Sequence, residues 1–243
     1  MTIKITNVLL AVALVTTFTG CGTISGGEEE TNQANLTEAA LANANRAPAT
    51  ADKPTALMLA AAEGDISEMQ DLVANGDNVN TETPEGTALT YALTSNQKNS
   101  ALYLMSRGAN PNKGFEQGEP SLLMIASERA DNRVVKALLA AGAEVNYADA
   151  QGESAISFAS YKGHLTTVKT LLKAGADVNV TPEGQSLLMR IVKNNDLLLA
   201  QVIIAAGADV NFADESGMTA LKIAQENNLA DLEMLLVQSG ATS

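Results

Sequence analysis

The sequence predicts an all-α solenoid of six helix-turn-helix repeats with projecting finger loops, and three periodic features support this fold class. A serine or threonine followed two positions later by Leu or Ile occurs six times. A glycine lies 21 residues after each of these hydroxyl residues, and an asparagine lies four residues beyond each of the first five glycines. Such a fixed period indicates stacked structural units. The hydroxyl residues are Thr55, Thr87, Ser121, Ser154, Ser186 and Thr219.

Each predicted unit has a body of constant length and a connection of variable length. The hydroxyl residue and its glycine are always 21 residues apart, whereas the gap from a glycine to the next hydroxyl residue varies from 11 to 13. Surface loops tolerate insertions better than packed elements do. We therefore expect rigid bodies joined by adjustable loops. The six glycines are Gly76, Gly108, Gly142, Gly175, Gly207 and Gly240.

Two short helices are predicted within each body. The hydroxyl residue is expected to cap the first helix, because its oxygen can accept a hydrogen bond from a free amide of the first turn. The second helix ends in an apolar pair such as Leu138-Leu139, and the following glycine is expected to adopt the left-handed conformation that closes a helix. The asparagine segment and a second glycine should then turn a finger loop. These second glycines are Gly86, Gly118, Gly152, Gly184 and Gly217.

The closing segments resemble those of ankyrin repeats. Residues 141–146, 174–179 and 206–211 all read Ala-Gly-Ala, an acidic residue, Val and Asn. The resemblance covers about residues 53–243 and implies the ankyrin solenoid, whose members usually bind proteins through inner helices and fingertips.

The opening Thr-Pro-Leu-His motif of that family is degenerate in this chain. Ala or Leu replaces its proline, and other residues replace its histidine. The inter-repeat hydrogen bonds of that histidine are therefore expected to be absent, with methionine packing in their place. The residues at the histidine position are Met58, Thr90, Met124, Ser157, Met189 and Lys222.

The N-terminal segment has the pattern of a secreted protein. Lys4 precedes an apolar stretch at residues 8–18, which suits a secretory signal and is too short to span a bilayer. The stretch ends in Phe18-Thr19-Gly20-Cys21, which resembles the lipobox of bacterial lipoproteins, although Phe18 stands where Leu is usual. An ordinary secretory signal with an incidental cysteine is the alternative.

The lipobox resemblance implies that residues 1–20 are a signal peptide and that Cys21 is lipidated. Because Gly22 follows, it also implies anchoring to the outer membrane, facing the periplasm. Residues 21–52 are polar, contain three consecutive glutamates and hold almost no large apolar residue, which is typical of a flexible tether. Residues 53–243 form the six repeats.

Composition argues against several functions. The net charge of −13 repels phosphate backbones, so no nucleic-acid partner is expected. Aromatic residues make up only 3% of the chain, which does not suit a large cofactor pocket. One cysteine and one histidine, His164, cannot assemble a multi-ligand metal site or a catalytic pair. We expect no enzyme activity, no cofactor and no metal, a turn hydrogen bond for His164, and a monomer.

The candidate binding surface lies near the ends of the first helices, where two positions in each repeat should face a groove. Arg129, Lys162 and Lys193 occupy these positions in successive repeats, and Tyr161 precedes Lys162. In an acidic chain this basic cluster predicts a protein partner with an acidic patch. Scattered surface charge is the alternative.

A second column follows the finger asparagines and holds Tyr147, Val180 and Phe212. These side chains are candidate anchors for the same partner; alternatively, the rings fold down onto neighbouring fingers. Arg190 falls in a column that is otherwise apolar, and we expect its long side chain to reach toward the groove.

Two functions remain open from the sequence. The first is a membrane-tethered interaction module of the bacterial envelope, for example an immunity protein that neutralises a secreted toxin such as a type VI lipase effector. The alternative is a structural or stress-related scaffold that organises a periplasmic protein or envelope complex. Both rest on family analogy, because a fold does not determine a function.

Overall fold

The computed structural model describes residues 50–242, which form six pairs of antiparallel helices joined by loops. Within this range every named element is helical, as the sequence predicts. The chain divides into two compact units, residues 1–34 and 35–243, and the described residues belong to the second. The predicted signal peptide, Cys21 and nearly all of the predicted tether lie outside the described residues.

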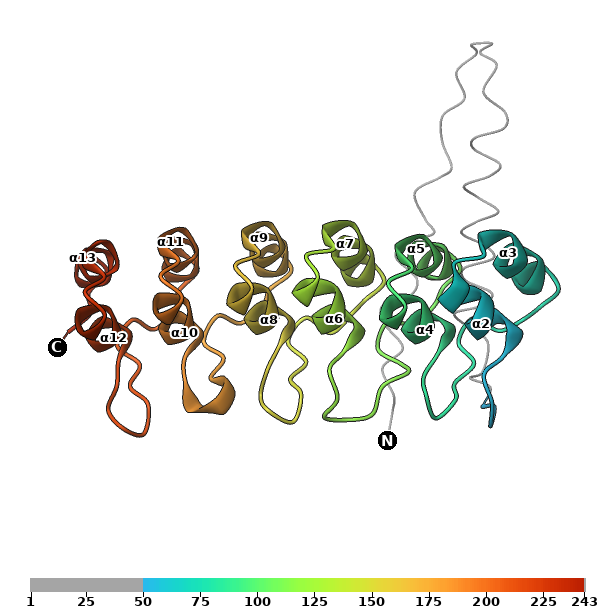
Figure 1. Cartoon of the computed structure of the whole chain (residues 1–243), viewed down its shortest axis with the longest axis horizontal. Helices are drawn as coiled ribbons and strands as arrows, with labels where there is room; N and C mark the ends of the chain where they lie inside the picture. The colour runs from blue at the N-terminus through green and yellow to red at the C-terminus, as the bar shows by residue number, and fades with distance from the viewer. Residues whose placement is uncertain (1–49, 243) are drawn as a thin grey trace, which may run out of the picture. The chain divides into compact units, whose positions relative to one another are not determined.

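The helices form two rows in chain order, and the loops project on the side of the first row (Figure 1). The first, inner helices are α2 (Ala56–Glu63), α4 (Ala88–Thr94), α6 (Leu122–Glu128), α8 (Ala155–Tyr161), α10 (Leu187–Lys193) and α12 (Ala220–Glu226). The second, outer helices are α3 (Ile66–Ala74), α5 (Lys98–Ser106), α7 (Asn132–Ala140), α9 (Leu165–Lys173), α11 (Leu197–Ala205) and α13 (Ala230–Gln238). The fourth finger contains a short 3-10 helix, η1 (Pro182–Gly184).

All six predicted hydroxyl residues stand at the N-caps of the inner helices. Five of them accept a hydrogen bond from the amide three residues later, at 3.2 to 3.4 Å. Ser154 differs, because the hydroxyl of Ser157 instead accepts the Ser154 amide at 2.6 Å. The helix starts are therefore set by local side-chain chemistry.

The glycine at the end of each outer helix adopts a positive φ, between 83° and 102°, as predicted. At α7 the Gly142 amide donates to Leu139 at 3.1 Å and the Ala143 amide donates to Leu138 at 2.9 Å. These two bonds form a Schellman motif, and the same pair closes the other five outer helices. Only glycine adopts this conformation without steric cost.

The finger asparagines connect each repeat to the next. Asn146 donates from Nδ2 to the Gly175 carbonyl oxygen at 3.1 Å, and its Oδ1 accepts the Asp177 amide at 2.9 Å. Four other asparagines bind the following repeat in the same two-point manner; they are Asn80, Asn112, Asn179 and Asn211. We call this series the asparagine ladder.

The position that holds histidine in the family motif differs in part from expectation. Met58, Met124 and Met189 are fully buried, in line with methionine packing. The sulfurs of Met58 and Met124 also accept the amide of the preceding cap residue, at 3.4 and 3.2 Å. The expected loss of hydrogen bonding is wrong for Thr90, whose hydroxyl donates to the Gly114 carbonyl oxygen of the next finger at 3.0 Å.

The core lies between the two rows and consists mainly of Leu, Ala, Val, Ile and Met. At the N-terminal end of the stack, Glu68 and Asp71 on α3 are exposed, and they give this end the polar face that a solenoid needs. None of the helices within residues 50–242 has the length and apolarity required to cross a lipid bilayer.

The asparagine ladder predicts a measurable loss of stability when one side chain is removed. Asn80 is only 7% exposed and makes two bonds, at 3.0 and 2.7 Å. Asn80→Ala leaves shielded backbone groups unpaired, so unfolding should become easier by about 2 kcal/mol. Urea denaturation of the full chain, followed by far-ultraviolet circular dichroism, measures the change.

Asn99→Ala is the matched control, because Asn99 is exposed on α5 and alanine favours a helix. Equal denaturation midpoints for Asn80→Ala and the unaltered chain would contradict a stabilising role for the ladder.

Candidate protein-interaction surface

The last turns of the inner helices form an exposed row, as the sequence predicts. We call this the groove row, and it consists of Thr94, Glu128, Arg129, Tyr161, Lys162, Lys193 and Asn194. Four of the predicted partner-binding residues, namely Arg129, Tyr161, Lys162 and Lys193, therefore lie at the surface of neighbouring repeats. No contact in the structure tests whether they bind a partner, so that role stays a prediction.

Arg129 also makes hydrogen bonds that connect two repeats within the fold. Its guanidinium donates to the carbonyl oxygen of Leu93 and, at 3.5 Å, to that of Thr94. Both carbonyls stand at the end of α4, where the last turn has no intrahelical donors. A cation there also opposes the negative end of the helix dipole. Arg129 thus joins the third repeat to the second.

Similar bonds join three other pairs of repeats at the same place. Gln97 donates to the Glu63 carbonyl oxygen at 3.3 Å, and Asn194 donates to that of Tyr161 at 3.3 Å. His164 Nε2 lies 2.9 Å from the Glu128 carbonyl oxygen. The predicted hydrogen bond of His164 therefore exists, but it reaches the preceding repeat rather than closing its own turn. Together with Arg129 these residues form a second series, which we call the helix-end ladder.

The basic charge of the groove row is partly balanced. Lys162 lies 3.3 Å from the Glu128 carboxylate, and its Nζ is 5.8 Å from the centroid of the Tyr161 ring. Tyr161 itself is 58% exposed, the largest exposure among the aromatic side chains named here. The ring of Tyr161 is therefore accessible to a partner, whereas the ammonium group of Lys162 beside it already forms an ion pair with Glu128.

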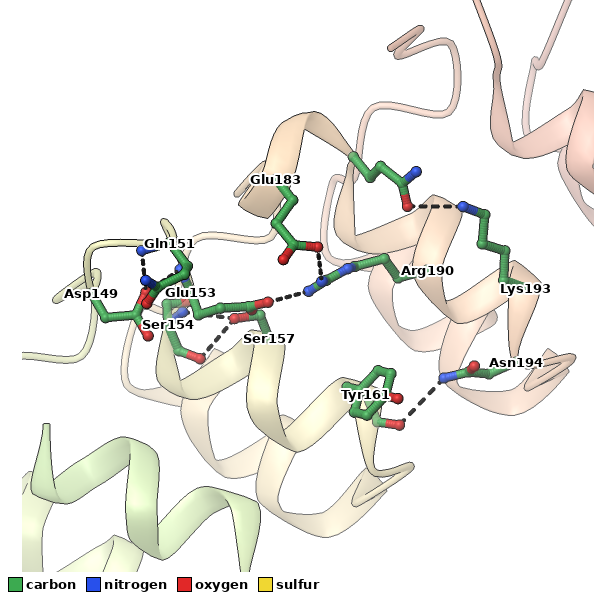
Figure 2. Close-up of polar contacts among 11 residues, drawn as sticks. Asp149, Gln151, Glu153, Ser154, Ser157, Tyr161, Glu183, Arg190, Lys193 and Asn194 are labelled. Atoms are coloured by element: carbon green, nitrogen blue, oxygen red, sulfur yellow. Dashed lines mark hydrogen bonds and ion pairs between the residues drawn. The ribbon is translucent and has the colours of Figure 1, made fainter. Parts of the chain in front are cut away.

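Arg190 lies between two fingers (Figure 2). Its Nη1 is 2.5 Å from Glu153, its Nη2 is 3.2 Å from Glu183, and its side chain is only 17% exposed. The side chain of Arg190 leaves the apolar column, but its two contacts are with finger carboxylates, so the expected reach toward the groove stays a prediction. The guanidinium is thus occupied in holding the third and fourth fingers to α10.

Lys193 is the freest cation of the groove row. Its Nζ donates to the Gln185 side chain at 2.9 Å, and no carboxylate of residues 50–242 lies within ion-pair distance (Figure 2). The pKa of the Asp214 carboxyl is lowered chiefly by the Ser216 hydroxyl and the Met218 amide, and to a smaller extent by the charge of Lys193.

The finger side chains Tyr147, Val180 and Phe212 are half-buried against the core. The Tyr147 ring meets the Phe115 ring edge to face, with centroids 5.4 Å apart, and its hydroxyl accepts the Gly118 amide at 2.9 Å. Tyr147 thus takes the alternative arrangement, in which the ring folds onto the neighbouring finger. Val180 and Phe212 keep part of their surface exposed.

A cavity of about 460 Å³ opens on the same face, where α4, α6 and α8 meet the second finger. Phe115, Ile125 and Phe158 form its apolar wall, and Glu119 and Glu128 lie among its acidic residues. Sequence reasoning placed the binding surface in repeats three to five and missed this cavity. The length of the second connection could have indicated it, because the 13-residue gap from Gly108 to Ser121 is the longest of the five.

Within residues 50–242 no three metal-binding side chains come together, so the described part of the chain offers no candidate metal centre.

The comparisons with known proteins agree with this geometry. A family model described as ankyrin repeats in three copies matches residues 29–114 and 113–182. The match begins inside the segment predicted as a tether, whose status stays a prediction. No curated protein sequence matches the chain.

Two solved structures are similar over most of their length. An ankyrin repeat domain from Acinetobacter baumannii AYE has a TM-score of 0.72 and 27% identity, covering 76% of this chain and 98% of that one. The ankyrin repeat domain of Bcl-3, described as a unique member of the IkappaB protein family, has a TM-score of 0.68 and 26% identity, covering 79% and 89%. The chain therefore belongs to the ankyrin-repeat family, whose fold serves as a protein-interaction module.

Proposed function

We propose that this protein is a membrane-tethered interaction module of the bacterial envelope, anchored through a lipid on Cys21 and binding its partner on the groove row of repeats three to five. The observation that carries the proposal is the exposed run of Tyr161, Lys162 and Lys193 on successive inner helices. Tyrosine is among the residue types enriched in interface hot spots, and complementary charge steers association.

The tether follows from the first part of the sequence. An apolar stretch ends at the only cysteine of the chain, and a polar segment separates that cysteine from the repeats. A flexible coil of roughly 30 residues has a typical end-to-end distance of about 30 Å. Such a tether keeps the repeats near the membrane while leaving their groove free to turn toward a partner.

The groove row suits a partner with an acidic patch. Arg129 is committed to the α4 carbonyls and Lys162 shares its charge with Glu128, so Lys193 offers the most available cation. Tyr161 adds an exposed ring between them. Complementary charge of this kind mainly steers association and sets the orientation of the partner. The Tyr161 ring would supply affinity when the partner covers it.

The role that fits these parts best is neutralisation of a toxin that acts on the envelope, such as a lipase delivered by type VI secretion. An inhibitor held at the membrane acts at a high effective concentration against an enzyme that must reach the same surface. A scaffold for an envelope complex is the second candidate and shares the anchor and the groove.

The anchor can be tested by replacing its acceptor. Cells that make the unaltered chain should incorporate a fatty-acid probe into it and retain it in the membrane fraction. Cys21→Ser removes the thiol, so both labelling and membrane retention should be lost. Labelling that persists in Cys21→Ser would refute lipidation at this position.

The groove contact can be tested with Lys162→Glu combined with Lys193→Glu. This double variant spares Arg129, whose loss would disturb α4, and should weaken partner capture at least about tenfold, or ~1.4 kcal/mol. Lys136→Glu with Lys169→Glu makes the same charge change on the outer helices α7 and α9, and should have no effect. Calorimetry against the captured partner, with circular dichroism as the folding control, decides between these outcomes.

A toxin-neutralising role also predicts a specific phenotype. A strain without this protein should grow normally alone and be killed by toxin-secreting sister cells. Survival in that mixed culture, together with an envelope defect in pure culture, would favour the scaffold instead.

A further inference from the structure

The groove face carries charges of opposite sign along its length. Lys162 and Lys193 belong to repeats four and five, whereas Glu85, Glu119 and Glu128 line the cavity at repeats two and three. Of these carboxylates only Glu128 takes part in the basic contact proposed above, through its ion pair with Lys162. The apolar wall, Glu85 and Glu119 are not used by that contact. They therefore call for a partner group of different chemistry.

The wall of the cavity is preorganised. Phe115, Ile125 and Phe158 are half-buried, so each leaves apolar surface uncovered. Phe115 is held edge to face by Tyr147, whose hydroxyl is fixed by the Gly118 amide. Because this contact already orients the Phe115 ring, binding a ligand against it costs less conformational entropy.

The base of the cavity is equally fixed. The Thr90 hydroxyl donates to the Gly114 carbonyl oxygen at 3.0 Å, which ties the second finger to α4. Gly86 and Gly114 approach so closely that a Cβ on Gly86 would lie 2.8 Å from the Gly114 oxygen. These contacts hold the first and second fingers close together beside the cavity.

The carboxylates around the cavity outnumber their basic partners. A second hollow of about 420 Å³ between the two fingers shares Glu85, Phe115 and Glu119 with the first and adds Glu116. Glu82 at its edge pairs with Lys113. By contrast, Glu85, Glu116 and Glu119 form no ion pair with any side chain of residues 50–242.

We infer that this cavity receives a lysine or arginine side chain from a protein partner, within a segment that also carries apolar residues. The inference rests on the proposed function and extends it by naming the partner chemistry at the other end of the groove. The long stem of such a residue packs on Phe115 and Phe158, and its charged head reaches Glu85 and Glu119. An acidic group would be repelled there, and a purely apolar group would leave the carboxylates desolvated without a partner.

The opposite charges also orient the partner. Its basic segment lies over repeats two and three, while its acidic patch lies over repeats four and five. Reversing the partner would place like charges together at both ends, which is costly and gives the interface a single direction.

The test uses the full chain in non-ionic detergent and a short fluorescein-labelled peptide of alternating lysine and leucine residues, followed by fluorescence anisotropy. Detergent alone provides the blank. Glu85→Gln with Glu119→Gln should weaken peptide affinity at least about tenfold, and Phe115→Ala should weaken it similarly. Glu68→Gln with Glu215→Gln removes two exposed carboxylates elsewhere and should leave affinity unchanged. Circular dichroism confirms that each variant folds.

The inference would be overturned by unchanged affinity in the cavity variants, by equal weakening in the Glu68 and Glu215 control, or by equal binding of a peptide with glutamate in place of lysine. Lysine methyl ester that binds as tightly as the peptide would also overturn it, in favour of a small cation. Failure of the proposed function would instead appear as unchanged partner capture in Lys162→Glu with Lys193→Glu, which is measured against the captured partner and not against this peptide.

Discussion

Two-point hydrogen bonding by the finger asparagines is the constraint that ties the repeats into one structure. A single helix pair exposes apolar surface on both sides and becomes stable only against its neighbours. Each asparagine fixes that neighbour by accepting one backbone amide and donating to the carbonyl of the glycine that ends the next outer helix. The register of the inner helices, and so the alignment of the groove row, depends on this spacing between repeats.

Residues at the ends of the inner helices stabilise the stack to different degrees. Arg129, His164 and Asn194 each bind a carbonyl oxygen at the end of the preceding inner helix. Tyr161 and Lys193 stand beside them without such a task and remain open to a partner. Residues at equivalent positions of different repeats therefore make different contacts, because only some of them lie within hydrogen-bond distance of the end of the preceding inner helix.

Finger length accounts for the position of the cavity. The second connection is the longest, and it places Phe115 and Glu119 beside residues of the inner helices α4, α6 and α8 in the cavity lining. In the third and fourth fingers, Arg190 draws Glu153 and Glu183 together and neutralises them. Glu85, Glu116 and Glu119 of the first and second fingers form no such ion pair within residues 50–242, which distinguishes these fingers from the two that Arg190 joins.

The sequence by itself determined the local structure of this protein: the helix starts at Thr55 and its equivalents, the helix ends at Gly142 and its equivalents, and the number of repeats. These features depend on atoms within about five residues of one another, so a periodic pattern reveals them. Only the tertiary structure decided the partners of Asn146, Arg129 and Arg190, and the cavity beside Phe115. Most of those contacts join residues about one repeat apart, and a local sequence pattern does not determine which of several nearby groups a long side chain will contact.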